Sequence, residues 1–370
     1  ARDAALAAVQ PIDTVTETIT SGAVDFNLNS ALYYIVNVDQ DFTATFSGLA
    51  SGVTNNAYIE LTNAGDHTVT WTNAAWDKGS EASLLGFTGG FKSSSYDNVS
   101  FSVDSEESSP SGMFLKEDGT KMYILGNGSN KVQQYSLSTA WDLNTASYDS
   151  VSFDVSTQVG FPFALFFKPD GTKMYAGGNG TNNIHQYSLS TAWDVGTASY
   201  DNVSHDVSSQ VGTHESIFFK SDGSKMYVSD NSVYQYSLST AWDLSTASYD
   251  SVSFDLTGQA SAPNAVFFKP DGTKMFMVGT SPVGVYQYSL STAWDLSTAS
   301  YDSVSFDVSN ESSAPNNLFF KPNGTRMLIL GRTISKVFQY STGEPVFDQS
   351  TLIEAIAQDD GTTPVKLRKI

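Results

Sequence analysis

The sequence predicts an all-β protein whose larger part is a five-bladed β-propeller of four-stranded blades. The first observation is a repeat, because the motif Ser-Tyr-Asp recurs five times, in steps of 52, 52, 49 and 52 residues. The second is that each copy holds four short strand patterns separated by turn signals, as a propeller blade does. No copy contains an uninterrupted helical period, which excludes a helical solenoid. A parallel β-helix usually needs shorter coils, so it is the second alternative. The repeated tyrosines are Tyr96, Tyr148, Tyr200, Tyr249 and Tyr301.

The second copy shows the strand patterns in order. Residues 148–155 alternate between apolar and polar side chains, and this period of two predicts a half-buried strand. Residues 164–167 form a short apolar run, which suits a strand covered on both faces. A Pro-Asp-Gly turn then leads to a return strand at 173–176, and an Asn-Gly turn leads to the last strand at 185–189. A polar link with the sequence Ala-Trp-Asp ends the copy.

The order of strands within the repeat predicts how the ring closes. The array begins with a Tyr-Asp strand and ends with a Gln-Tyr-Ser strand. If each Tyr-Asp strand is outermost in the preceding blade, the last blade lacks one strand and the first copy has one to spare. We therefore expect residues 96–103 to pair with residues 337–341, which would remove the open edges of the array.

The two ends of each blade differ in how strictly they repeat. The Pro-Asp-Gly and Trp-Asp loops share one end and are nearly identical in each copy, whereas the loops at the opposite end vary. Loops on rigid scaffolds often carry function, although they also accept change freely. We interpret the variable end as a binding face around the central channel. The candidate ligand-binding residues are Ser111, Phe163, His214, Glu215, Asn264 and Asn316.

Tryptophans mark the repeated end in four of the five copies. They would suit either the stacking of sugar rings or the filling of the wedge between blades, and we favour the packing role. The four are Trp141, Trp193, Trp242 and Trp294.

Residues with catalytic potential are few. The chain has four histidines and no cysteine, so a thiol nucleophile is excluded. His205 replaces a phenylalanine found in the other four copies and is expected to fill that strand position. His214 and Glu215 are the one acid–base candidate near the channel. We therefore expect no enzyme activity, no metal and no cofactor, with a metal-dependent hydrolase that uses Glu215, Asn264 and Asn316 as an alternative.

The composition of the chain argues against several classes of binding partner. The 370 residues carry a formal net charge of −20, which argues against nucleic acid and against anionic membranes. No apolar stretch of about 18 residues occurs, so we expect no membrane insertion. The acidic run at 104–107 is expected to be a solvated loop, with a calcium site as the lesser alternative.

The remaining sequence divides the chain into further segments. Short strand patterns at spacings near ten predict a β-sandwich or β-prism before the repeats. After them, residues 350–358 are expected to form one or two helical turns, and residues 364–370 a basic end. We assign an N-terminal segment at 1–11, the sandwich as an assembly domain at 12–93, the propeller at 94–342 and a C-terminal segment at 343–370.

Part of the N-terminal domain resembles domains of bacteriophage tail-fibre and spike proteins. The resemblance is carried by Val-Asp-Phe-Asn-Leu at 24–28, by Ala-Tyr-Ile-Glu-Leu-Thr-Asn-Ala-Gly at 57–65 and by Thr-Val-Thr-Trp at 68–71. It implies a structural domain that often forms trimers and joins the modules of a fibre. The repeats are similar to propeller arrays of phage virion proteins and bacterial surface proteins, and lactonase-like propellers share the Pro-Asp-Gly turn.

These resemblances imply a function. We expect an extracellular virion protein of a phage, either a tail fibre, a spike or a decoration, whose propeller is displayed for attachment to a host surface or glycan. The expected partners are other virion proteins or copies of the chain itself, with a homo-oligomer such as a trimer. The alternatives are a lectin-like adhesin that is secreted or on a cell surface, and a lactonase-like propeller hydrolase.

Overall fold

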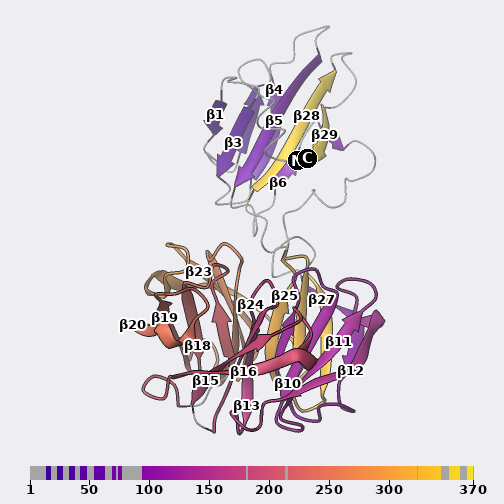
Figure 1. Cartoon of the computed structure of the whole chain (residues 1–370). Coiled ribbons are helices and arrows are strands. Elements are labelled where there is room, and N and C mark those ends of the chain that lie inside the picture. The colour runs from indigo at the N-terminus through magenta and orange to yellow at the C-terminus, as the bar shows by residue number, and fades with distance from the viewer. Residues whose placement is uncertain are drawn as a thin grey trace. The chain divides into compact units, whose positions relative to one another are not determined.

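The structure of the chain is a computed structural model with two compact units (Figure 1). One unit comprises Ser95–Ser341, and the other comprises Ala1–Ser94 together with Thr342–Ile370. The structure describes residues 14–17, 23–27, 33–37, 42–47, 54–62, 69–71, 74–76, 94–180, 182–212, 216–322, 324–342, 350–358 and 365–369.

The larger unit is a five-bladed propeller, as predicted (Figure 1). Each blade is an antiparallel sheet of four strands, and its first strand contacts the first strands of both neighbouring blades, so that these strands surround the channel. These inner strands are β9 (Pro110–Leu115), β13 (Pro162–Phe167), β17 (Ser216–Phe219), β21 (Pro263–Phe268) and β25 (Pro315–Phe320).

Two further strands of each blade follow the inner strand directly in sequence. The second strands are β10 (Lys121–Gly126), β14 (Lys173–Gly178), β18 (Lys225–Ser229), β22 (Lys274–Thr280) and β26 (Arg326–Gly331). The third strands are β11 (Lys131–Leu137), β15 (Asn183–Leu189), β19 (Ser232–Leu238), β23 (Val283–Leu290) and β27 (Lys336–Ser341).

The outermost strand of each blade is the Tyr-Asp strand, as the closure prediction requires. In blades one to four it is β12 (Ala146–Asp154), β16 (Ala198–Asp206), β20 (Ala247–Asp255) and β24 (Ala299–Phe306). In blade five it is β8 (Ser95–Ser102), which comes from the start of the array and pairs with β27. Tyr96 lies opposite Tyr340, and Phe101 lies opposite Val337. The predicted closure of the ring is therefore confirmed.

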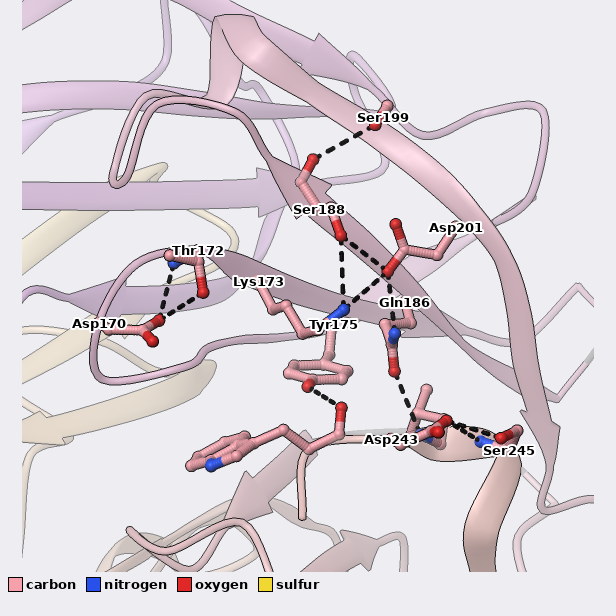
Figure 2. A network of polar contacts seen from close by, with 12 residues as sticks. Asp170, Thr172, Lys173, Tyr175, Gln186, Ser188, Ser199, Asp201, Asp243 and Ser245 are labelled. Carbon is pink, nitrogen blue, oxygen red and sulfur yellow. Dashed lines mark hydrogen bonds and ion pairs between the residues drawn. The ribbon is translucent and has the colours of Figure 1, made fainter. Parts of the chain in front are cut away.

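Polar side chains join each blade to the next along the seam, and Figure 2 shows one example. Asp201 accepts hydrogen bonds from Lys173 Nζ at 3.0 Å and from Gln186 Nε2 at 2.9 Å. The Oε1 of Gln186 accepts the backbone N–H of Leu244, in the loop before the next outer strand, at 3.1 Å. Partial burial acts to raise the pKa of Asp201, but the hydrogen bonds to its carboxylate lower it overall. Asp201 thus holds the amide of Gln186 within its own blade, and the same amide makes the hydrogen bond across the seam.

The tryptophan loops complete the seams at the turn end of the propeller. Each is followed by a short 3₁₀ helix: η5 (Leu143–Thr145), η6 (Val195–Thr197), η7 (Leu244–Thr246) or η8 (Leu296–Thr298). Trp242 is buried, and its carbonyl oxygen accepts the hydroxyl of Tyr175 at 2.7 Å (Figure 2). Gly171 has a φ of +73°, and a Cβ at this position would lie 2.4 Å from the ring of Trp193. The turn glycine is therefore required both by backbone conformation and by contact with the tryptophan.

The packing role predicted for the tryptophans is confirmed. Trp141, Trp242 and Trp294 are buried, Trp193 is half-buried, and each stacks on at least one phenylalanine of an inner strand.

His205 occupies the position that phenylalanine takes in the other copies, as predicted. Its ring contacts Tyr236 edge-on, with centroids 5.5 Å apart, and Phe254 contacts Tyr288 in the same way in the next blade. Burial lowers the pKa of His205, although Asp206 acts in the opposite direction. An unfolded histidine has a pKa of about 6.5, so below that pH the unfolded chain binds more protons than the folded chain.

We therefore expect His205→Phe to reduce the loss of stability on acidification. In the parent protein the free energy of unfolding should fall as the pH drops below about 6.5, and the variant should lose less of it. His185 is buried and its pKa is also lowered by burial, so part of the loss should persist. Urea midpoints at pH 8 and pH 5 measure the difference. An identical loss in parent and variant would show that His205 does not contribute.

The described strands of the smaller unit form two sheets. Strands β1 (Thr14–Glu17), β3 (Tyr33–Asn37) and β5 (Thr54–Thr62) pair in parallel in one sheet. The intervening strands pair in parallel in the second sheet, and they are β2 (Ala23–Asn27), β4 (Phe42–Ser47) and β6 (Val69–Trp71). Successive strands thus alternate between the sheets. The predicted β-sandwich stays a prediction.

The C-terminal segment corrects one expectation. Ser350–Gln358 is strand β28, not helical turns, and it pairs antiparallel with β5 along its whole length. The basic end forms β29 (Val365–Lys369), which pairs with β28 and in parallel with β7 (Ala74–Trp76). The part of the chain that the structure describes holds no helix of the length and hydropathy needed to cross a membrane.

Candidate functional site

A ring of five phenylalanines closes the central channel. Each inner strand contributes one, at the position before its last residue. Neighbouring rings meet edge to face, with centroid distances of 5.2–5.4 Å and interplanar angles of 67–73°. This arrangement is the preferred geometry for aromatic pairs, because the positive edge of one ring meets the negative face of the next. The five are Phe114, Phe166, Phe218, Phe267 and Phe319.

On the turn side of this ring lies a cavity of about 160 Å³, which we call the turn-end cavity. Its floor is the phenylalanine ring, and its walls include Trp193 and Trp294. Its rim carries the residue before the Asp or Asn of each turn. These rim residues are Glu117, Pro169, Ser221, Pro270 and Pro322. The cavity is therefore apolar, apart from one carboxylate and one hydroxyl.

The described residues on the opposite side of the ring enclose a second, smaller cavity. A cavity of about 20 Å³ lies there, lined among others by Met113, Ser216 and Leu318. This volume suffices for about one water molecule. Of these two cavities, the turn-end cavity is the one with room for a ligand larger than water.

Ion pairs surround the turn end. Lys168 Nζ lies 2.7 Å from Asp170, and the equivalent pairs in blades one, three and four are Lys116–Asp118, Lys220–Asp222 and Lys269–Asp271. Partial burial acts to raise the pKa of Asp170, but hydrogen bonds from Lys168 and Thr172 outweigh it and lower the pKa to about 2. The turn aspartates are therefore charged at neutral pH, and each cancels the charge of its lysine.

The structure uses three of the predicted ligand-binding residues to tie blades together. Ser111 Oγ donates to the carbonyl of Pro162 at 2.7 Å. The amide groups of Asn264 and Asn316 donate to the carbonyls of Pro315 and Ser111, at 2.6 and 2.9 Å. These bonds satisfy backbone carbonyls between neighbouring inner strands. That the same residues bind a ligand stays a prediction.

The other three candidates are less closely grouped. Phe163 is buried, and the guanidinium of Arg332 lies over its ring, 5.1 Å from the centroid. His214 and Glu215 lie outside the described residues. No cluster of three or more His, Cys, Asp or Glu side chains with the spacing of a metal site occurs in the described parts of the chain.

Glu107 corrects the expectation of a solvated acidic loop. Its side chain is buried and accepts hydrogen bonds from the backbone N–H groups of Ser109, Gly128 and Ser129, at 2.7–3.0 Å. The hydroxyl of Ser129 donates a fourth, at 2.6 Å. A signal was present in the repeat, because the equivalent residues of the other copies are small or apolar. They are Val159, Val211, Ala260 and Ser312.

Comparison with known proteins gives likeness at the level of structure. Neither a protein-family model nor a curated protein matches the chain. A solved structure from Lactobacillus plantarum is 10% identical, with 70% of this chain and 74% of that chain covered and a TM-score of 0.39. The periplasmic gluconolactonase of Pseudomonas aeruginosa is 13% identical, with coverages of 70% and 69% and a TM-score of 0.37. A proposed 6-phosphogluconolactonase from Bacteroides fragilis is 13% identical, with coverages of 70% and 87% and a TM-score of 0.41.

These findings correct the expected function. The comparison does not support the prediction of a bacteriophage virion protein: these three structures are of bacterial proteins, and two of them are named as a gluconolactonase or 6-phosphogluconolactonase. The predictions of a virion location, of host attachment and of carbohydrate binding depend on that reading and are withdrawn with it. The expectation of no enzyme activity is not supported either, since both of these names are those of enzymes. The predicted homo-oligomer stays a prediction.

Proposed function

We propose that the propeller binds a small molecule with an apolar body in the turn-end cavity. The observation that carries the proposal is the combination of a closed aromatic floor and a rim that carries two polar residues, Glu117 and Ser221, at one end of the channel. Small-molecule sites are typically concave and apolar, with a few polar groups that fix orientation. The turn-end cavity has this composition, with Glu117 and Ser221 as its non-proline rim residues.

The rigidity of the site supports the proposal. Tyr123 and Tyr227 donate their hydroxyls to the carbonyls of Trp193 and Trp294, at 2.6 and 2.7 Å. Each tryptophan also stacks on inner-strand phenylalanines. The walls are therefore held before a ligand arrives, which reduces the entropy that binding would cost.

Binding of 3,3-dimethylbutan-1-ol, a compact neutral probe, tests the proposal. We expect ligand-observed NMR to detect binding to the intact chain, and Ser221→Trp to weaken it at least tenfold by filling the mouth. Ser221 is exposed, so the variant should fold normally. Phe161→Ser, at an exposed position of the variable end, is the control and should bind as the parent does. Binding lost in the control but kept in Ser221→Trp would place the ligand at the opposite end.

A lactonase-like hydrolase at the variable end is the second candidate. Asn264 and Asn316 are held at equivalent positions of their inner strands, and the sequence places Glu215 at the same position of the third copy. Glu215 would act as the general base that activates water. Glu215→Gln should then lose the hydrolysis of gluconolactone, measured by the release of acid, while the probe still binds the turn-end cavity. Equal rates in parent and variant would exclude this role of Glu215.

A further inference from the structure

We propose that the turn-end cavity selects organic cations such as a trimethylammonium group, and that Glu117 sets this preference. The inference rests on the proposed function, since it assigns a chemical class to the ligand of the same cavity. Three observations carry it: the aromatic lining, the placement of Glu117, and the neutralised lysines around the rim.

The lining suits a cation because aromatic faces are electronegative. Cations within about 6 Å of an aromatic centroid are attracted to the face, and quaternary ammonium groups are commonly bound by several aromatic side chains. The wall residue Trp193 already has such a neighbour, since the ammonium of Lys116 lies 5.7 Å from its ring centroid. A weakly hydrated trimethylammonium group would make the same interaction from inside the cavity while covering apolar surface.

Glu117 gives the rim an asymmetric negative charge. It lines the cavity where the other copies have Pro169, Ser221, Pro270 and Pro322. Its side chain is exposed and makes no hydrogen bond or ion pair of the described part of the chain. In the same turn, the carboxylate of the next residue, Asp118, is already bound by Lys116 and Thr120. The carboxylate of Glu117 is thus available to a ligand at the mouth.

In four of the five blades, the lysine near the rim is paired with an aspartate and so does not attract an anion to the cavity. Lys116, Lys168, Lys220 and Lys269 each lie 2.7–2.8 Å from the aspartate of their own turn. In the fifth copy the sequence has Asn323 in place of that aspartate, so the charge of Lys321 is not cancelled in this way. Lys321 is absent from the described cavity lining, whereas Glu117 belongs to it. The net charge of −20 further concentrates cations around the protein.

Three probes of nearly equal shape and different charge test the inference: choline, 3,3-dimethylbutan-1-ol and 3,3-dimethylbutanoate. We expect choline to bind the intact chain about threefold to tenfold more tightly than the neutral alcohol, and the carboxylate most weakly, as one carboxylate at a solvated rim allows. The advantage of choline should shrink in 0.5 M salt because the rim charge is screened. Titration calorimetry at low and high salt measures all three.

Variants at equivalent rim positions separate this inference from the proposed function. Glu117→Ser reproduces the residue of the third copy and should bind choline and the alcohol equally, while Ser221→Glu should increase the preference for choline. Equal binding of both probes by the parent would refute the cation preference and leave the apolar site standing. Binding of neither probe would refute the proposed function itself. Tightest binding of 3,3-dimethylbutanoate would show that Lys321 sets the charge preference of the rim, and it would overturn the role of Glu117.

Discussion

Deletion of strand β8 (Ser95–Ser102) is expected to destroy the cooperative unfolding of the propeller. Without it, β27 becomes an open edge, and the carboxylate of Asp97 no longer accepts Gln339 Nε2 at 2.8 Å or the Ser341 N–H at 2.9 Å. The ring contact between Tyr96 and Tyr340, 5.5 Å between centroids, is also lost. Domains are stable by only about 5–15 kcal/mol, so losing a whole strand should remove much of that margin. Urea unfolding should become broad, and gel filtration should show association through the free edge.

A matched control is available within the chain. Residues 147–154 have the sequence Ser-Tyr-Asp-Ser-Val-Ser-Phe-Asp, which differs from β8 at two positions. One of these is the bulge residue, and Asn98 and Ser150 both have a φ of 57° there. Replacing β8 with this sequence should restore the parent's unfolding midpoint. A deletion variant with the parent's midpoint and cooperativity would show that closure of the ring does not stabilise the propeller.

The architecture of the propeller was predictable because the chain contains its own alignment. Five copies separate positions that must be constant, such as Gly171 beside its tryptophan, from positions that vary. The strand left over at Tyr96 and the strand missing after Tyr340 then determined the closure. The register of this pairing is strictly specified, because a one-residue slip would move every side chain of a strand to the wrong face.

The location of the cavity could not be read from the same comparison. Phe166 and its equivalents are identical in all copies, so they had the pattern of core residues, and variation directed attention to the opposite end. Ser111 and Asn316 vary there, yet both bond to neighbouring inner strands. A sequence comparison cannot distinguish a hydrogen bond to the next blade from one to a ligand, because both require a polar side chain at the same position.

The error at the C-terminus has a related cause. Ser350 and Glu354 suggested a capped helix, but local propensity was overridden by pairing with a strand almost three hundred residues earlier. Ser350 pairs with Thr62, and Gln358 pairs with Thr54. Strand formation depends strongly on such partners, which a local pattern does not reveal.

The second prediction with a large effect concerns the floor of the cavity. Phe166 is buried and lies 5.2 Å from Phe114 and 5.3 Å from both Phe218 and Phe219, between ring centroids. It also stacks on Trp242. We expect Phe166→Ala to lower the free energy of unfolding by about 3–5 kcal/mol, since it removes these contacts and leaves a void. Phe166→Leu keeps most of the volume and should cost less than about 1.5 kcal/mol. Urea denaturation of the three proteins measures both values.

The same variant links the stability of the ring to the proposed function. Removing the ring of Phe166 opens the floor between the turn-end cavity and the small space lined by Leu165 and Ile217. The enlarged cavity should bind a bulkier neutral probe, such as benzyl alcohol, more tightly than the parent does, while Phe166→Leu should differ little. Unchanged probe binding together with the expected loss of stability would mean that the five rings serve the fold alone. In that case the apolar composition of the cavity would follow from packing, and the ligand would have to be sought at the variable end.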